Sequence, residues 1–341
     1  MAFVRVAFLT YGYGLQDYGI GKYAWHLSRE LRKMGVTFDV YTTRFKVRNV
    51  GPLLFFVSNS LLNVKEYDVV HSNEGAGLLT RHPNIVETYH HDYAAIDRRY
   101  VAFNIVELQH CKRAKHVIVP SFSTKHALAS HGIEDDKISV IYHGVDEIFR
   151  PRKDLRAKIR STYGLDEETF VIISIGRLTR HKRHVDIVRA LKNVPATALI
   201  LVGKGECWPE ISEAAREASV RLLHFQDVKE DFLVELLNAS DLYVHASRIE
   251  GFGMTVLEAM ACSLPVVACE TADFDRLIGH AGMLMRDLDV DELSNIIAQL
   301  QQDKDLLRKM SSDAVSRSQK FTWQQSAATH LGVYADLCKS Q

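Results

Sequence analysis

Short apolar runs recur along this chain and alternate with stretches whose apolar residues have helical spacing, such as residues 21–33. A first series of runs covers residues 3–9, 38–41, 69–71, 85–89, 117–119 and 138–141. A second series covers residues 171–175, 198–202, 222–225, 242–244 and 265–268. Strands that are buried on both faces and separated by helices form parallel sheets with helices on either side. The chain is therefore predicted to be α/β, with two doubly wound, Rossmann-like sheets.

A polar, turn-rich stretch separates the two series, with a turn at residues 144–151 and a charged segment at 152–165. We place the domain boundary near Pro151, which gives a first domain of residues 1–150 and two halves of ordinary domain size. Residues 290–300 and 324–339 have helical patterns. Ligands of doubly wound sheets bind beyond the carboxyl ends of the strands, so two such domains in tandem predict a ligand cleft between them.

Composition and charge bear on the partners and the location of the protein. Lys plus Arg and Asp plus Glu both number 42, and this zero net charge gives no support for nucleic acid as a partner. No run approaches the ~20 apolar residues that cross a bilayer, and the first residues lack the features of a signal peptide. We expect a cytoplasmic protein, at most peripheral on the inner membrane face. The five cysteines lack paired spacing and are predicted to be free thiols, not zinc ligands: Cys111, Cys207, Cys262, Cys269 and Cys338.

The strongest local motif runs from Glu250 to Glu258. Gly251 and Gly253 lack a Cβ and allow a close approach of the backbone. A helix is predicted to begin near Met254, so that its first N–H groups can bind a phosphate. Glu258 would then lie about one turn inside the helix, where it can accept hydrogen bonds from ribose hydroxyls, and Glu250 would lie level with the sugar. The alternative is a common strand-to-helix turn that carries two surface carboxylates.

A second motif follows the predicted strand at residues 171–175. Arg177 comes directly after this strand, and Lys182 lies five residues later at a predicted helix start. Two fixed cations in this position could neutralise a diphosphate as charge builds on a leaving group. The alternative is a solvated basic turn.

Two loops of the first domain are further candidates. Residues 18–23 place glycines before a helix, which suits a phosphate or a sugar. The preceding residues begin like a dinucleotide fingerprint, but Asp17 stands where its last glycine belongs, and we reject NAD. Residues 87–92 end a strand with two adjacent histidines, one of which could direct its ring into the cleft. The alternative is a loop histidine satisfied by its neighbours.

Two other patterns are interpreted as structural. Asp289 and Asp291 match the DxD pattern of metal-dependent transferases, but they precede a helix, where Asp is a favoured cap. Residues 44–48 and 53–57 mix basic and apolar side chains. They could touch an anionic membrane surface, although a buried helix of the first domain is the preferred interpretation.

Together these motifs resemble the retaining GT-B glycosyltransferases of family 4 (group 1), and the resemblance covers nearly the whole chain. Glu250 and Glu258 reproduce that family's two glutamates with seven residues between them. The spacing from Arg177 to Lys182 reproduces its phosphate-binding pair. The surrounding framework also matches, at residues 239–241, 258–261 and 265–267.

The resemblance implies a role for each predicted site residue. Arg177 and Lys182 would bind the donor diphosphate, Glu258 would bind the ribose, and Gly19 would face the phosphates. Glu250 would contact the donor sugar together with a run of backbone groups: Gly251, Phe252, Gly253, Met254 and Thr255. The family's histidine near the reacting carbon falls at His90 when aligned from Thr88 and at His91 when aligned from Asp92, and His90 is preferred. The predicted catalytic residues are therefore His90, Arg177, Lys182 and Glu250.

The resemblance also implies the reaction and the course of the chain. A hexose would move from a nucleoside-diphosphate donor to an acceptor hydroxyl with retention, and no metal or other cofactor would be obligatory. A last helix at about 324–341 would return to the first domain, which leaves residues 151–323 as the nucleotide-sugar-binding domain. Base recognition would involve residues 225–228, and the acceptor, a glycan, a lipid or a small molecule, would meet residues 12–21 and 93–100. The alternatives are a nucleotide-sugar epimerase or hydrolase of the same fold and a non-catalytic subunit that binds sugar nucleotides.

This chain departs from the family pattern at several loops. Arg183 stands where a glycine usually follows the lysine, and Tyr18 replaces the first loop glycine. Lys204 lies between two glycines where the family often has an acidic or polar residue, and residues 269–275 lack the usual paired glycines. These departures bear on the donor sugar and on loop shape, while the phosphate-binding pair is intact.

Overall fold

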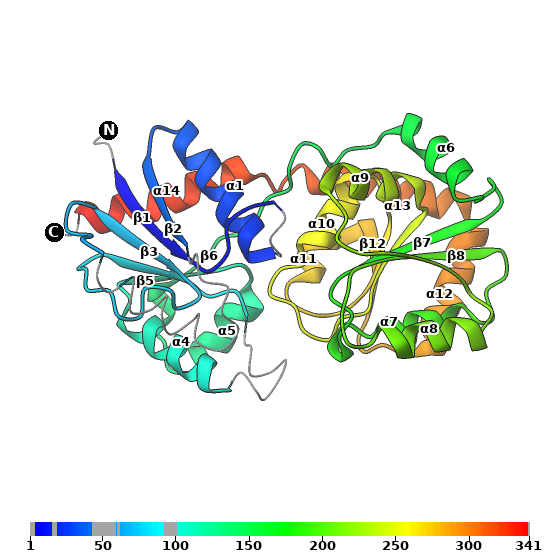
Figure 1. The fold of residues 1–341 in the computed structure, drawn as a ribbon, viewed down its shortest axis with the longest axis horizontal. Coiled ribbons are helices and arrows are strands. Elements are labelled where there is room, and N and C mark those ends of the chain that lie inside the picture. The colour runs from blue at the N-terminus through cyan, green and yellow to red at the C-terminus, as the bar shows by residue number, and fades with distance from the viewer. Residues whose placement is uncertain (1–3, 16–18, 43–58, 60–61, 92–100, 340–341) are drawn as a thin grey trace. The chain divides into compact units, whose positions relative to one another are not determined.

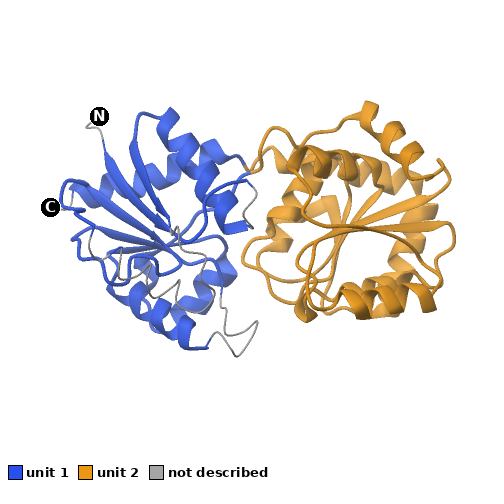
Figure 2. Cartoon of the chain, viewed as in Figure 1, with its two compact units in different colours: residues 1–144, 322–341 blue, residues 145–321 orange. Residues whose placement is uncertain are grey.

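The computed structural model describes residues 4–15, 19–42, 59, 62–91 and 101–339 of the chain. Contacts within the chain divide it into two compact units (Figure 2). Unit 1 comprises Met1–Gly144 and Thr322–Gln341, and unit 2 comprises Val145–Phe321.

Unit 1 contains a six-stranded parallel sheet in the order β2-β1-β3-β4-β5-β6. Helices α1 and α14 lie on one face of this sheet, and α4 and α5 lie on the other (Figure 1). The strands are β1 (Arg5–Thr10), β2 (Thr37–Thr42), β3 (Val69–Asn73), β4 (Ile85–Thr88), β5 (His116–Val119) and β6 (Ile138–Val140). The helices are α1 (Gly19–Lys33), α4 (Val101–Arg113), α5 (Phe122–Ser130), the short 3-10 helix η2 (Asp135–Lys137) and α14 (Trp323–Lys339).

Unit 2 contains a second six-stranded parallel sheet, in the order β12-β11-β10-β7-β8-β9. Helices α7, α8 and α12 lie on one face and α6, α9, α10 and α13 on the other (Figure 1). The strands are β7 (Phe170–Ile175), β8 (Thr197–Val202), β9 (Arg221–Phe225), β10 (Leu242–His245), β11 (Val266–Cys269) and β12 (Gly282–Met285). The helices are α6 (Lys153–Thr162), η3 (Arg180–Lys182), α7 (His184–Leu191), α8 (Trp208–Glu217), α9 (Glu230–Ala239), α10 (Met254–Ala261), α11 (Phe274–Ile278), η4 (Gly279–Ala281), α12 (Val290–Gln302) and α13 (Lys304–Ser318).

The prediction of two doubly wound parallel sheets is confirmed, because the central strands are buried on both faces. Every residue of β7 and of β10 is buried, which is why neither sequence alternates between apolar and polar residues. Each buried Val, Leu or Ile of such a strand contributes roughly 1.5–3 kcal/mol of hydrophobic stabilisation. Strand β12 was not predicted, because its four residues begin with Gly282 and include no β-branched side chain.

The contact division places the crossings between the units at Gly144/Val145 and Phe321/Thr322, whereas the sequence placed them at 150/151 and 323/324. The difference has a physical reason in the segment before Pro151. The side chain of Asn238 on α9 accepts a hydrogen bond from the Arg152 N–H at 2.6 Å and donates to the Arg150 carbonyl at 3.1 Å. These bonds attach the connecting segment to unit 2.

Helix α14 belongs to unit 1 and is joined to it by a chain of buried side chains. His330 Nδ1 faces the Ser326 carbonyl at 2.8 Å, so this nitrogen carries the proton and Nε2 accepts the hydroxyl of Tyr23 at 2.9 Å. Tyr23 has no second proton, so Thr88 donates to it at 3.1 Å. His71 Nε2 must then donate to Thr88 at 2.6 Å, and His71 Nδ1 accepts the Tyr334 hydroxyl at 2.6 Å. Every proton in this chain is assigned, and both histidines are neutral.

Burial keeps these histidines uncharged. Burial lowers the pKa of His330 to about 4, and burial with the repulsion of His330 lowers the pKa of His143 to about 3. The same causes hold the pKa of His71 well below its usual range. A charged imidazole in this core would lose its hydration without gaining an anionic partner, so protonation opposes folding.

Acid should therefore destabilise the protein. The unfolded chain binds a proton at each of these histidines near pH 6.5 while the folded chain does not, so the free energy of unfolding falls as the pH drops below about 6.5. Each such histidine costs about 1.4 kcal/mol per pH unit until its folded pKa is reached. Urea unfolding between about pH 5 and pH 7.5 measures this slope.

A matched pair of variants tests the assignment of that slope. His330→Gln removes one buried titrating group and should make the slope shallower, whereas His280→Gln changes an exposed histidine and should leave it as it is. A free energy of unfolding that does not change over this pH range would contradict neutral, buried histidines.

Candidate functional site

The strand order of unit 2 contains one switch point, between β7 and β10. The chain continues from β7 to β8 and β9 on one side of the sheet and then returns to β10, β11 and β12 on the other. Doubly wound sheets bind their ligands at such a point, beyond the carboxyl ends of the strands. The loops that follow β7 and β10 are the two segments that carry the predicted motifs, so the topology brings both motifs to one place.

Lys182 and Glu250 meet at this switch point. The Lys182 ammonium contacts Glu250 Oε1, and His245 Nε2 lies 2.8 Å from the same oxygen. Both side chains of the ion pair are mostly buried, with exposed fractions of 16% and 14%. Arg177 in the same loop is exposed, and within the described part of the chain no carboxylate lies within ion-pair distance of its guanidinium. The site thus carries one paired and one unpaired fixed cation.

The charges in this cluster depend on one another. Burial by itself raises the pKa of the Glu250 carboxyl, but Lys182 and His245 more than offset this and hold that pKa well below its usual range. Burial and the nearby Lys182 lower the pKa of His181 to about 4 and that of His184 to about 3. At neutral pH the site therefore contains an ionised Glu250, a charged Lys182 and two neutral histidines.

Helix α10 begins at the switch point after a glycine in the left-handed conformation. Gly253 has φ 91°, and a Cβ there would lie 2.5 Å from the ring of Phe274. The N–H groups of the first turn of a helix have no partner inside it, and here they belong to Met254 and Thr255. Glu258 lies one turn further and is buried. Backbone donors and a carboxylate thus follow each other along one helix, as predicted for a phosphate and a ribose.

Two glycines, Gly203 and Gly205, shape the Arg177 loop. The motif had singled out only Lys204, the residue between them. A Cβ on Gly203 would lie 1.8 Å from the Gly176 carbonyl oxygen, and one on Gly205 would lie 2.3 Å from that of Leu178. The Leu178 N–H donates to the Lys204 carbonyl at 3.0 Å, which joins the loops after β7 and β8. The signal for this role was a Gly-x-Gly pattern directly after a predicted strand.

His245 and Tyr243 were also missed as site residues. Both lie in β10 and both are buried, whereas the predicted strand covered residues 242–244 and ended before His245. Tyr243 donates its hydroxyl proton to Thr255 Oγ1 at 2.8 Å, and His245 contacts Glu250. The signal available in the sequence was a histidine at the carboxyl end of a strand, five residues before a predicted site glutamate.

Arg183 adopts the backbone conformation of the glycine that the family usually has at its position. Its φ is 55° and its ψ is 31°, a left-handed conformation that costs a residue with a side chain roughly 1 kcal/mol. Its guanidinium contacts Asp186 at 2.8 Å, Asp287 at 3.0 Å and the Leu288 carbonyl at 3.0 Å. These contacts offset the backbone cost, so the turn around Lys182 keeps its shape without a glycine.

In unit 1 the switch point lies between β1 and β3, and His90 follows the next strand, β4. The Thr10 hydroxyl donates to the Gly12 carbonyl at 3.0 Å and accepts Asn73 Nδ2 at 3.0 Å. Asn73 therefore presents its Oδ1 to His90 Nε2 at 2.8 Å, which fixes the proton on Nε2. Burial and nearby histidines, His143 first, lower the pKa of His90 well below its usual range, so Nδ1 is a neutral acceptor.

The other predicted features of unit 1 lie near this point or outside the described residues. His91, the alternative to His90, is only partly buried. Gly19 is the exposed first residue of α1, and a Cβ there would meet no atom within 4 Å, so sterics do not require a glycine. Tyr18, Asp92 and residues 44–48, 53–57 and 93–100 lie outside the part of the chain that the structure describes.

The structural interpretation of Asp289 is confirmed. Its carboxylate caps α12, accepting from the N–H groups of Asp291 at 2.8 Å and Glu292 at 2.9 Å. In the described ranges there is no group of three or more His, Cys, Asp or Glu side chains arranged to bind a metal. Over the same ranges, no helix is both long enough and apolar enough to cross a bilayer.

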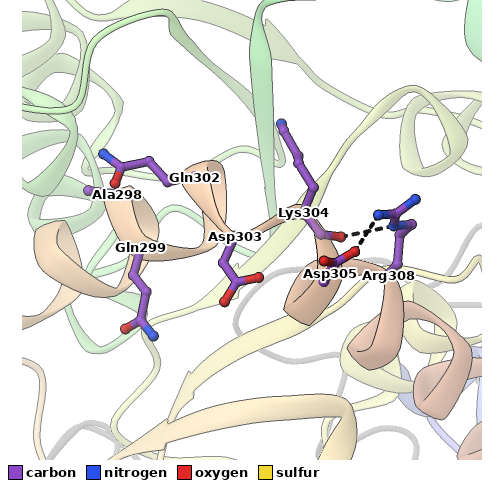
Figure 3. A pocket seen from close by; sticks show the side chains of 7 residues that line it. All are labelled: Ala298, Gln299, Gln302, Asp303, Lys304, Asp305 and Arg308. Atoms are coloured by element: carbon purple, nitrogen blue, oxygen red, sulfur yellow. Dashed lines mark hydrogen bonds and ion pairs between the residues drawn. The ribbon is translucent and has the colours of Figure 1, made fainter.

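A hollow of about 710 Å³ lies elsewhere in unit 2, at the junction of α12 and α13 (Figure 3). Side chains that line it stabilise the beginning of α13. Asp303 caps this helix by accepting the Leu306 N–H at 2.9 Å, and Arg308 forms an ion pair with Asp305 one turn away. None of the predicted site residues lines it. This hollow is a surface feature separate from the switch point.

Family models match both halves of the chain, and solved structures share its fold. The family model described as glycosyl transferases group 1 matches residues 156–317, and that of glycosyltransferase family 4 matches residues 18–148. The chain belongs to the group 1 glycosyltransferases of the family 4 type, and its fold is GT-B.

A curated relative and two solved structures give the degree of similarity. N-acetyl-alpha-D-glucosaminyl L-malate synthase of Bacillus anthracis is 29% identical over 213 residues, which cover 59% of this chain and 54% of the relative. The chain spans about half the length of the first curated relatives it matches. Sucrose-phosphate synthase of Thermosynechococcus elongatus is 20% identical with a TM-score of 0.85, covering 99% of this chain and 100% of the other. Anabaena HepE in complex with UDP-glucose is 23% identical with a TM-score of 0.77, covering 96% and 99%.

Alanine at Gly203 should disrupt the Arg177 loop. Its Cβ would overlap a backbone carbonyl that has little room to move, and we expect a loss of about 3 kcal/mol in the free energy of unfolding. Gly332→Ala is the matched control, because a Cβ on this helical glycine would meet nothing within 4 Å. Helix propensity predicts that it stabilises the protein by up to about 1 kcal/mol. Equal effects of the two substitutions in urea unfolding would show that the close approach does not shape the loop.

Two substitutions at Arg183 separate its backbone cost from its side-chain contacts. Alanine and glycine both remove the guanidinium, but only glycine relieves the left-handed conformation. We expect Arg183→Gly to be more stable than Arg183→Ala by about 1 kcal/mol in urea unfolding. The reverse order would mean that the turn around Lys182 does not need a left-handed residue.

Proposed function

We propose that this chain transfers a sugar from a nucleoside-diphosphate donor to an acceptor hydroxyl, with retention of configuration and without an obligatory metal. The observation that carries the proposal is the grouping of Arg177, Lys182, Glu250 and the start of α10 at the switch point of unit 2. Cations, helix N–H groups and buried carboxylates together match the parts of a nucleotide sugar: a diphosphate and two sets of ring hydroxyls.

The diphosphate would bind to Arg177, Lys182 and the N–H groups at the start of α10. Arg177 is exposed and offers its planar guanidinium to phosphate oxygens, which it can contact through two N–H groups at once. Lys182 would exchange its contact with Glu250 for one with the phosphate. The N–H groups of α10 are held in place by the helix before charge builds on the departing diphosphate, and this preorganisation makes them effective in the transition state.

The two glutamates would bind the two sugars of the donor. Glu258 on α10 would accept the ribose hydroxyls, and Glu250 would accept hydroxyls of the transferred sugar. The backbone of Gly251, Phe252 and Gly253 would approach that sugar closely, because the glycines present no Cβ. Ionised Glu250 suits this role, since a carboxylate only accepts hydrogen bonds and sugar hydroxyls donate them.

For the chemical step we propose attack from the face that the diphosphate leaves, with a phosphate oxygen accepting the proton of the acceptor hydroxyl. His90 of unit 1 would act as an uncharged hydrogen-bond acceptor through Nδ1. This ring nitrogen has no proton, because the contact with Asn73 places the proton on Nε2. A neutral imidazole suits a reacting carbon that becomes positive, where a second cation would be unfavourable.

Relatives support the donor class. One relative is named N-acetyl-alpha-D-glucosaminyl L-malate synthase, and HepE has been solved in complex with UDP-glucose. We propose a nucleotide sugar as the donor and a glycan, a lipid or a small molecule as the acceptor. A cytoplasmic location, with or without contact with a membrane surface, is part of the same proposal.

Arginine 177 provides the first test of this function. One of UDP, GDP or ADP should stabilise the protein without a metal, by about 2.7 kcal/mol at a concentration 100 times its dissociation constant. Arg177→Ala should weaken binding about tenfold and cut this stabilisation to about 1.4 kcal/mol at the same concentration. Thermal unfolding with each nucleotide, without and then with magnesium, measures the effect.

The matched control is Arg216→Ala, which removes an exposed arginine of α8 that is not among the predicted site residues. The nucleotide should stabilise this variant as much as the wild type. If Arg216→Ala weakened nucleotide binding as much as Arg177→Ala does, the effect would come from the loss of one positive charge and not from a contact of Arg177. No stabilisation of the wild type by any of the three nucleotides would count against a nucleotide-sugar donor and favour a scaffold role.

A further inference from the structure

His245 lies at the carboxyl end of β10 between two polar partners. Its Nε2 lies 2.8 Å from Glu250 Oε1, and its Nδ1 lies 3.2 Å from the Tyr243 hydroxyl oxygen. The ring also meets the ring of Phe274 edge to face, with centroids 5.4 Å apart. The side chain is buried, so both nitrogens depend on these partners for hydrogen bonds.

The protons in this group can be counted. Tyr243 donates its only proton to Thr255 Oγ1, so its oxygen can only accept from His245 Nδ1. On the other side of the ring, the Glu250 carboxylate is ionised and can only accept from Nε2. Both ring nitrogens therefore carry a proton. An imidazole with two N–H groups is a cation.

Charged and titratable groups from several elements lie near His245. Glu250 contacts the ring directly, and Glu258 on α10 adds a second carboxylate that acts on the neighbouring phenol. Lys182 of η3 contacts Glu250 from another element. His184 on α7 interacts electrostatically with His245, but burial and Lys182 lower the pKa of His184 to about 3, so it is neutral.

We propose that His245 is a positively charged positioning residue for the donor. It donates one N–H to Glu250 and the other to Tyr243, and it keeps the Glu250 carboxylate in place when Lys182 binds the diphosphate. Among the described residues, Glu250 Oε1 has two partners, Lys182 and His245. Once Lys182 turns to phosphate, His245 is the partner that remains, and its charge adds to the cations that the diphosphate meets.

This inference rests on the proposed function and predicts a particular dependence of UDP binding on pH. His245→Gln keeps an N–H near the position of Nε2 but carries no charge. The dissociation constant of UDP should therefore be about tenfold higher for His245→Gln than for the wild type at about pH 6, the size of a one-unit coupling between ionising groups. The ratio should fall toward one as the pH is raised far enough to remove the second ring proton of the wild-type His245. Taking the ratio removes the titration of UDP itself, which both proteins share.

Two more variants complete the binding experiment. Tyr243→Phe removes the acceptor that requires the second proton, so it should lose the pH-dependent part of UDP binding as His245→Gln does. His280→Gln, an exposed histidine of the same unit, should match the wild type at every pH. Titration calorimetry with UDP, and with GDP and ADP in parallel, gives the constants. A ratio that is the same at all pH values, or equal to one throughout, overturns the proposal.

Nitrogen-15 spectra of the histidine rings provide a test that needs no ligand. The resonances that disappear in His245→Gln should show two protonated ring nitrogens at about pH 7, and a neutral tautomer would overturn the proposal. If the wild type binds none of the three nucleotides, the proposed function fails and the positioning role fails with it. If the wild type binds one of them and the variants bind it equally well, only the role of His245 fails.

Discussion

The pairing of β7 with β10 is the constraint on which the candidate site depends. Leu242 lies beside Ile172 and Tyr243 beside Ile173, although β8 and β9 intervene in the chain. This register brings the ends of the two strands together, and Lys182 and Glu250 follow those ends by one loop each. Because β7 and β10 are buried on both faces, a shift of either strand would expose apolar side chains and separate the ion pair. The core therefore fixes the site.

Left-handed backbone conformations occur in the loops of unit 2 even at residues that are not glycine. Asp227 and Ala272 both have φ 49°, in loops that follow β9 and β11. Asp227 pairs with Lys204 at 2.7 Å, but both side chains are largely exposed, so this pair contributes at most about 1 kcal/mol. A left-handed residue with a side chain costs about as much. The pair with Lys204 is therefore of the same size as the backbone cost at Asp227.

Sequence predicted the features that depend on local patterns and missed those that depend on distant contacts. Eleven apolar runs indicated strands, and the two-sheet fold followed from them, because burial on both faces leaves a continuous apolar segment. Arg177, Lys182, Glu250 and Glu258 could be proposed because their spacing is local. His71 and Tyr334 are 263 positions apart, and no local pattern indicates that they share a hydrogen bond. His245 was missed for a related reason, since a buried strand position gives no sign of which polar groups will face it.

Two buried histidines illustrate how the surroundings decide the charge of a site. His90 faces an amide oxygen among other histidines, and this environment holds its ring neutral. His245 faces a carboxylate and a hydroxyl oxygen that can only accept, and this arrangement requires a second proton. In the proposed reaction the two states suit opposite charges: a cation near the departing diphosphate, and a neutral acceptor near a carbon that becomes positive. Neither state follows from the histidine itself, because an imidazole near neutral pH takes the form that its partners favour.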